Sequence, residues 1–115
     1  MVTSTHVLDF KDKEGKRYIF TKQNFDNHAA RHQELQIPNF IDRIKKAIIK
    51  PDYVYPAFNK KHRFCYYYLE GEVAGTKRYT KVVVDKTKYC YIIVSAYRPT
   101  NLREESYGEA LCYRP

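Results

Sequence analysis

The sequence predicts an α+β domain in which two N-terminal helices pack on a four-stranded antiparallel sheet, preceded by a short N-terminal hairpin. Three observations favour this class. The chain has 115 residues, the length of one ordinary domain. Its helical periodicity comes before the strand-like runs instead of alternating with them. After Pro51, runs rich in β-branched and aromatic residues follow one another. We therefore expect residues 1–115 to form a single domain.

The N-terminal half supplies the hairpin and both helices. HVLDF and KRYIF flank the turn sequence KDKEG, where Gly15 allows the tight turn. The pattern over about 24–36 is helical, and Pro38 ends this helix or opens the next. PNFIDRIKKAIIK then places apolar residues at helical spacing, with cations on its flank. The apolar stripe is Phe40, Ile41, Ile44, Ala47 and Ile48, and the flanking cations are Arg43, Lys46 and Lys50.

The second half predicts an antiparallel meander. Its strands are DYVYP, HRFCYYYLE, RYTKVVVD and YCYIIVSAY, and the turn signals EGEVAGTK and DKTK separate the last three. Strict alternation places Tyr89, Tyr91, Ile93, Ser95 and Tyr97 on one face of the last strand. We expect that sheet face to present Lys81, Ser95 and several tyrosines to solvent. The alternative is an ordinary exposed sheet face, on which tyrosines are common.

The charge balance points to an anionic partner. Lys and Arg number 21 against 13 Asp and Glu, which gives a formal charge of +8, and 12 tyrosines accompany them. Basic and aromatic residues together suit nucleic acid, although an ordinary cationic surface has the same composition. We expect a cytoplasmic protein without a membrane partner, because no apolar run approaches the roughly 20 residues that cross a bilayer. Three widely spaced cysteines indicate neither a disulfide framework nor a zinc ribbon, and we expect Cys65 and Cys90 to be buried thiols.

The stretch FDNHAARHQEL places His28 and His32 four residues apart in the first predicted helix. At 100° per residue the two imidazoles share one helix face, directed inward or to the edge of the core. Three interpretations stay open, namely satisfied core residues, a pair of acid and base groups, or metal ligands. A metal site would need a third ligand, and the sequence has no zincin-type H-E-x-x-H.

Five segments in order carry a resemblance. His28 with RHQEL, the helix ending AIIKPDYVYP, then RFCYYY, KVVVD and YIIVSAY resemble the phage-associated members of the barnase, EndoU, colicin and RelE nuclease superfamily. The usual pieces there are RHPEL, a helix followed by P-D, a strand beginning with Arg, a K-V-V-V strand and a final T-A-Y. The match spans about 25–97. Gln33 replaces the usual Pro, and Ser95 replaces the usual Thr but keeps a hydroxyl.

The resemblance implies a metal-independent endoribonuclease, a toxin or phage effector that needs no cofactor. In such enzymes the ribose 2′-OH attacks the adjacent phosphorus, which requires a base, an acid and cations for the developing charge. On this hypothesis His28 and His32 transfer protons, Arg63 and Lys81 stabilise the phosphate, and Ser95 and Tyr97 supply hydrogen bonds and base contacts. The residues predicted to bind RNA outside this centre are Arg31, Arg43, Lys46 and Tyr91.

Two other classes of function use the same sequence features. A non-catalytic RNA-binding module needs the basic, tyrosine-rich surface but no histidine geometry. A protein-binding module would make the histidines incidental. The expected partners are RNA and, for a toxin, an immunity or antitoxin protein.

Overall fold

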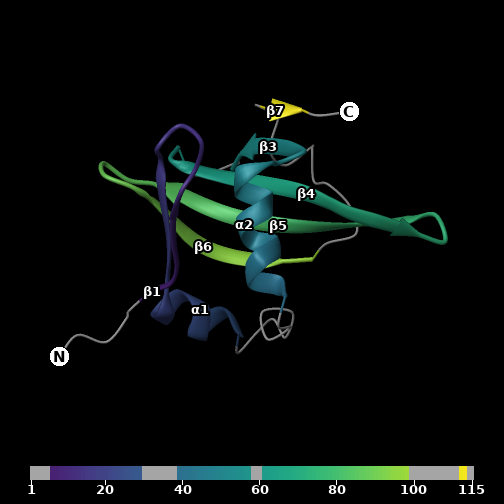
Figure 1. Cartoon of the computed structure of the whole chain (residues 1–115), viewed down its shortest axis with the longest axis horizontal. Coiled ribbons are helices and arrows are strands. Elements are labelled where there is room, and N and C mark those ends of the chain that lie inside the picture. The colour runs from purple at the N-terminus through teal and green to yellow at the C-terminus, as the bar shows by residue number, and fades with distance from the viewer. Residues whose placement is uncertain (1–5, 30–38, 58–60, 99–111, 114–115) are drawn as a thin grey trace.

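The computed structural model describes residues 6–29, 39–57, 61–98 and 112–113. In chain order the elements are β1 (His6–Lys11), β2 (Arg17–Thr21), α1 (Lys22–Ala29), α2 (Phe40–Ile49), β3 (Tyr53–Pro56), β4 (Arg63–Val73), β5 (Thr76–Lys86), β6 (Tyr91–Tyr97) and β7 (Cys112–Tyr113). Six strands form one mixed sheet in the order β1-β2-β6-β5-β4-β3, and the two-residue β7 pairs with β3 (Figure 1).

The predicted fold class is wrong. Among the described residues 55% are in strands and 21% in helices, so the domain is mostly β instead of two helices on four strands. The predicted meander does exist as β3, β4, β5 and β6, each antiparallel to the next. The N-terminal hairpin, however, is part of the same sheet, because β2 pairs in parallel with β6, with Tyr18 opposite Tyr91. An isolated two-stranded hairpin is marginal in water, and joining the edge of the meander buries Tyr18, Ile19 and Phe20.

The two helices have different places. α2 crosses one face of β4 and β5, as Figure 1 shows, and its apolar stripe enters the main core. The buried members of that core are Tyr18, Phe20, Phe40, Ile44, Ala47, Ile48, Val82, Val84, Ile93 and Ala96. α1 lies beside β1, β2 and β6, where the Asn24 amide donates to the Ile93 carbonyl at 3.3 Å. The helix predicted over 24–36 begins at Lys22, and residues 30–38 lie outside the described part.

The sheet is buried on both faces. Opposite α2, a second cluster contains Tyr55, Cys65, Tyr67, Tyr79 and Val83. As a result β5 has six consecutive buried residues, 79–84, where one solvent-facing side was predicted. Cys65 is a buried free thiol as expected, whereas Cys90 is only partly buried.

Two bulges change which side chains share a face. In β6 the pairing with β5 skips Val94, so Ile93 lies opposite Val84 while Ser95 lies opposite Val83. The predicted single face from Tyr89 to Tyr97 is therefore wrong, because Tyr91 and Ile93 lie on the α2 face and Ser95 on the other. In β4 the skipped residue is Glu70. Within the described part of the chain, neither helix is long and apolar enough to span a bilayer.

Candidate nucleic-acid interface

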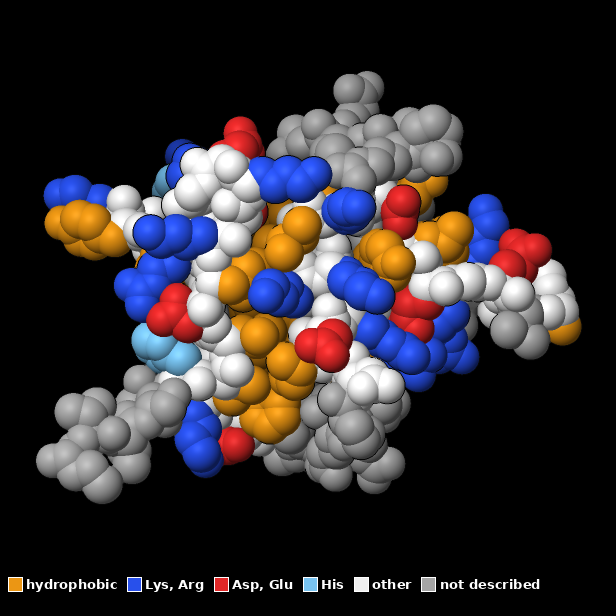
Figure 2. Space-filling model, viewed as in Figure 1, with side chains coloured by type: hydrophobic (Ala, Val, Ile, Leu, Met, Phe, Trp, Pro, Cys, Tyr) orange, Lys and Arg blue, Asp and Glu red, His pale blue; other side chains and the backbone are white. Residues whose placement is uncertain are grey.

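The outer side of α2 carries lysines beside a shallow groove. Because the apolar stripe of this helix faces the sheet, its intervening positions are directed to solvent. The groove has a volume of about 630 Å³. Figure 2 shows Lys and Arg side chains gathered around apolar surface where α2 crosses the sheet. We call this surface the lysine groove, and it is lined by Asp42, Lys45, Lys46, Ile49, Lys50 and Tyr68. Three ammonium groups against one carboxylate make it attractive to an anion.

Three aromatic rings continue the same face across β1, β2 and β6. Phe10 stacks on Tyr18 with ring centroids 5.6 Å apart, and Tyr18 stacks on Tyr91 at 4.8 Å. We call these residues the aromatic row. Lys45 Nζ lies 5.5 Å from the Phe10 ring centroid, and Lys16 Nζ lies 6.0 Å from that of Tyr91. The row therefore has a cation over each end, and Lys45 joins it to the lysine groove. Its middle ring, Tyr18, is 2% exposed and belongs to the core.

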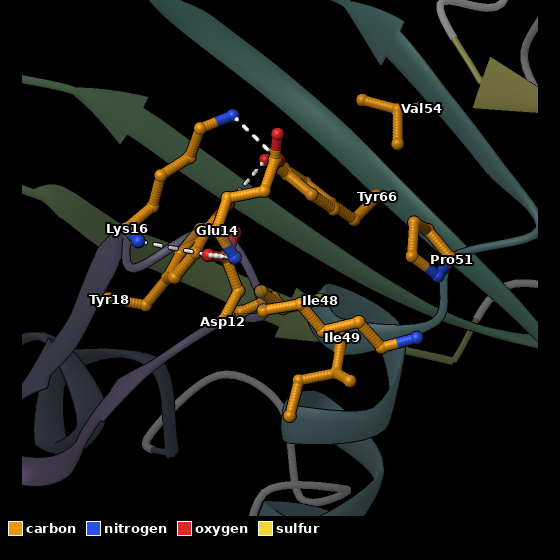
Figure 3. Close-up of a pocket in the computed structure, with 10 residues that line it drawn as sticks. Asp12, Glu14, Lys16, Tyr18, Ile48, Ile49, Pro51, Val54 and Tyr66 are labelled. Atoms are coloured by element: carbon orange, nitrogen blue, oxygen red, sulfur yellow. Dashed lines mark hydrogen bonds and ion pairs between the residues drawn. The ribbon is translucent and has the colours of Figure 1, made fainter.

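A cleft of about 490 Å³ opens between the β1–β2 turn and the C-terminal end of α2 (Figure 3). The turn is built by Asp12, whose Oδ1 accepts from the backbone N–H of Glu14 and of Lys16, each at 2.9 Å. Gly15 has a φ of +84°, which glycine adopts without strain. This geometry fixes the charged rim of the cleft. Its full lining is Asp12, Lys13, Glu14, Lys16, Tyr18, Ile48, Ile49, Pro51, Val54 and Tyr66.

Two phenols form the polar part of the cleft. The hydroxyls of Tyr18 and Tyr66 are 3.0 Å apart and share a hydrogen bond, although the strands that carry them are not neighbours in the sheet. Burial raises the pKa of both Tyr18 and Tyr66, so both phenols are neutral at physiological pH. The pair uses one O–H in the mutual bond, which leaves the other hydroxyl able to donate to a ligand.

Arg43, predicted to bind RNA, is engaged in an ion cluster. Its Nη1 donates to Glu70 Oε1 at 2.8 Å, Arg98 donates to the same carboxylate at 3.0–3.2 Å, and the Thr80 hydroxyl also donates to it. The β4 bulge places Glu70 there. Burial would raise the pKa of Glu70, but the hydrogen bonds from Arg98 and Thr80 and the arginine charges outweigh it, so the pKa lies below its ordinary value. The cluster ties α2 to the sheet.

Three residues predicted for catalysis lie on the face opposite α2. Arg63 donates two hydrogen bonds to Asp85, at 2.6 and 2.9 Å, which raises the pKa of Arg63 and offsets its charge locally. Lys81 is 3% exposed, with its Nζ 5.4 Å from the Tyr67 ring centroid, and Ser95 is 8% exposed. Because both side chains are buried, the expected solvent-exposed face with Lys81 and Ser95 is wrong. Arg63 pairs with Asp85, which is four residues from Lys81 on β5, so Arg63 and Lys81 are about 13 Å apart along the strand.

The other predicted residues divide as follows. Lys46 and Tyr91 lie on the α2 face with Arg43, on the other side of the sheet from Arg63, Lys81 and Ser95. Tyr97 pairs with Lys81 across β5 and β6. His28 belongs to α1, but its side chain is outside the description. Arg31 and His32 are outside it altogether. Among the described residues, no three His, Cys, Asp or Glu side chains form a group that could hold a metal ion.

The sequence did not identify the cleft or the aromatic row. Tyr18 and Tyr66 are two of twelve tyrosines, and the two residues are 48 positions apart in the chain. Their meeting depends on where α2 and the β1–β2 turn lie, which no local pattern encodes. Lys45 did have a signal, since it lies between apolar positions of the amphipathic helix.

Comparison of the chain with protein-family models, curated proteins and solved structures gives no match.

Proposed function

We propose that this protein binds single-stranded RNA along the α2 face, through the lysine groove. The observation that carries the proposal is the grouping of exposed Lys45, Lys46 and Lys50 beside Tyr68. Lysines spaced along one helix suit successive phosphates, and the partly exposed Tyr68 ring beside them suits a base. A folded duplex hides its bases, so this combination favours a single strand.

Charge outside the groove supports the same partner. The whole chain carries a formal charge of +8, which would draw a polyanion from a distance. Of the cations near α2, Arg43 is already neutralised by Glu70, whereas the three groove lysines have one acidic neighbour, Asp42, in the groove lining. The lysines are therefore the groups we expect to release counterions from RNA.

Cleavage of the bound RNA stays a prediction that rests on the sequence resemblance. On that hypothesis the catalytic residues are His28, His32, Arg63, Lys81, Ser95 and Tyr97. A strand held on the α2 face would be on the other side of the sheet from Arg63, Lys81 and Ser95. For this reason we propose binding, the alternative function from the sequence, in preference to catalysis.

The test is a triple variant, Lys45→Ala with Lys46→Ala and Lys50→Ala. Binding of a fluorescent oligoribonucleotide is measured by anisotropy at several salt concentrations. Each single-strand phosphate contact contributes about 0.7 to the slope of log K against log salt, so three lost contacts should reduce the slope by about 2. The same RNA, incubated with chelator and run on a denaturing gel, shows whether the wild-type protein cleaves it.

A second triple variant is the control. Lys61→Ala with Lys77→Ala and Lys88→Ala removes the same charge from exposed lysines outside the groove. We expect its RNA affinity to stay much closer to that of the wild type. Equal losses in the two triple variants would mean that net charge alone binds RNA, and the proposed interface would be wrong.

A further inference from the structure

We propose that the cleft between the β1–β2 turn and α2 is a binding site for one nucleobase of the RNA. The proposal rests on the proposed function, because it names a subsite of the same face. The cleft has a volume of about 490 Å³, within the range of roughly 300–1,000 Å³ that is usual for small-ligand pockets. It is lined by residues from the β1–β2 hairpin, α2 and the start of β3, together with Tyr66 of β4.

The lining has the two properties that a base requires. One side is apolar, with Ile48 and Ile49 from α2 and Pro51 and Val54 beyond it, which suits the faces of a flat ring. The other has hydrogen-bonding groups, the Tyr18–Tyr66 hydroxyl pair and, at the rim, carboxylates of the turn (Figure 3). Phenol oxygens accept from and donate to ring edges, and carboxylates accept from amino and imino groups. An aliphatic ligand would leave these polar groups unmatched.

The position of the cleft connects it to the phosphate-binding lysines. Ile49 lines both the cleft and the lysine groove, so the two open on the same end of α2. A nucleotide with its base in the cleft can place its phosphate toward Lys50, and the next phosphates can follow the groove. Tyr18 belongs to both the cleft and the aromatic row. One strand of RNA can therefore use the cleft and the lysine groove together.

The charged rim argues against an acidic peptide as the occupant. Asp12 and Glu14 line the cleft together with Lys13 and Lys16, and Glu14 forms an ion pair with Lys16 at 3.2 Å. Carboxylates at the entrance would repel acidic side chains entering the cleft. They are compatible with a base, which carries donor groups but no negative charge, while its phosphate stays at the lysines.

The experiment compares ligands that differ only in the base. The full chain is titrated with each of the four ribonucleoside monophosphates and with ribose 5-phosphate, followed by backbone-amide NMR shifts. Ribose 5-phosphate has no base to bury against the apolar side of the cleft, so it should bind roughly 10- to 150-fold more weakly than the best nucleotide. The shifts should centre on 12–18, 48–54 and 66. Equal binding of ribose 5-phosphate would overturn base recognition.

A pair of matched variants locates the site. Tyr66→Phe keeps the ring and removes the hydroxyl, so nucleotide affinity should fall roughly 2- to 12-fold, as expected for one hydrogen bond. Tyr89→Phe makes the same change on an exposed residue outside the cleft and should leave affinity unchanged. Equal affinities in the two variants would overturn the assignment of the cleft.

The two proposals fail in different ways. If an oligoribonucleotide binds with a steep salt dependence but no nucleotide perturbs the cleft, the base site is wrong and binding by the lysine groove stands. If nucleotides bind in the cleft but the oligoribonucleotide does not bind at all, the proposed function is wrong.

Discussion

The two faces of the sheet are both buried, yet they are built from different residues. The α2 face has an aliphatic and aromatic core beneath a helix whose outer side carries exposed lysines. The opposite face buries tyrosines together with Lys81, which is only 3% exposed. A lysine in a strand therefore does not by itself indicate a cationic surface. A lysine on the polar side of an amphipathic helix does, because the core on the other side forces it to solvent.

Burial of Lys81 has a physical reason. The apolar stem of a lysine can lie along other side chains, and its ammonium group is stabilised by an aromatic ring. The Tyr67 ring takes this position at 5.4 Å from Nζ. Alternation of polar and apolar residues therefore failed as a guide to exposure on this face of β5.

The largest effect should come from the core beneath α2. Phe40 is fully buried there, so Phe40→Ala should lower the free energy of unfolding by about 3–5 kcal/mol, measured by urea denaturation. Tyr89→Ala truncates a ring that is 84% exposed, so the free energy of unfolding of this variant should stay within about 0.5 kcal/mol of the wild-type value. A loss under about 1 kcal/mol for Phe40→Ala would mean that α2 is not held by burial against this face.

A smaller effect should come from the ion cluster that ties α2 to the sheet. Glu70→Gln removes the charge that faces Arg43 and Arg98. It should lower the free energy of unfolding by about 1–3 kcal/mol near neutral pH. Because folding lowers the pKa of Glu70, its contribution is present above its ordinary value of 4.5 and is lost as the pH falls through the folded value. The stability difference between wild type and Glu70→Gln should therefore narrow below pH 4.5.

The control for the ion cluster is Glu72→Gln. Glu72 is exposed in the same β4–β5 hairpin, so Glu72→Gln should change the free energy of unfolding by no more than about 0.5 kcal/mol. A difference between wild type and Glu70→Gln that persists unchanged at acidic pH would contradict the lowered pKa of Glu70.

The smallest effect should distinguish the two faces directly. Lys81→Gln is expected to change RNA affinity by less than about twofold, because the buried Lys81 is remote from the groove. Lys46→Gln should reduce the salt slope by about 0.7. Anisotropy with one oligoribonucleotide measures both. A larger loss for Lys81→Gln than for Lys46→Gln would show that RNA uses the face opposite α2, where the sequence placed the phosphate site.

Much of the local structure followed from the sequence. The amphipathic stripe from Phe40 to Ile48 predicted both α2 and the side that it buries. The glycine turn at Gly15 and the β-branched runs predicted the hairpin and the four meander strands. These predictions succeeded because the spacing of apolar side chains and the residue preferences of turns act over a few residues. Lys46 was placed on the cationic helix surface for the same reason.

The basic charge, the N-terminal hairpin, the helices, the four meander strands and the solvent-facing side of α2 follow from the sequence alone. The parallel pairing of β2 with β6 depends on long-range packing, since it connects residues more than 70 positions apart. Long-range packing also sets the bulges at Val94 and Glu70, which move Ser95 to one face and place Glu70 beside Arg43 on the other. Single extra residues in a strand reverse which face later side chains occupy, and their positions depend on packing between distant segments. The separation of Tyr91 from Ser95 follows from the bulge at Val94.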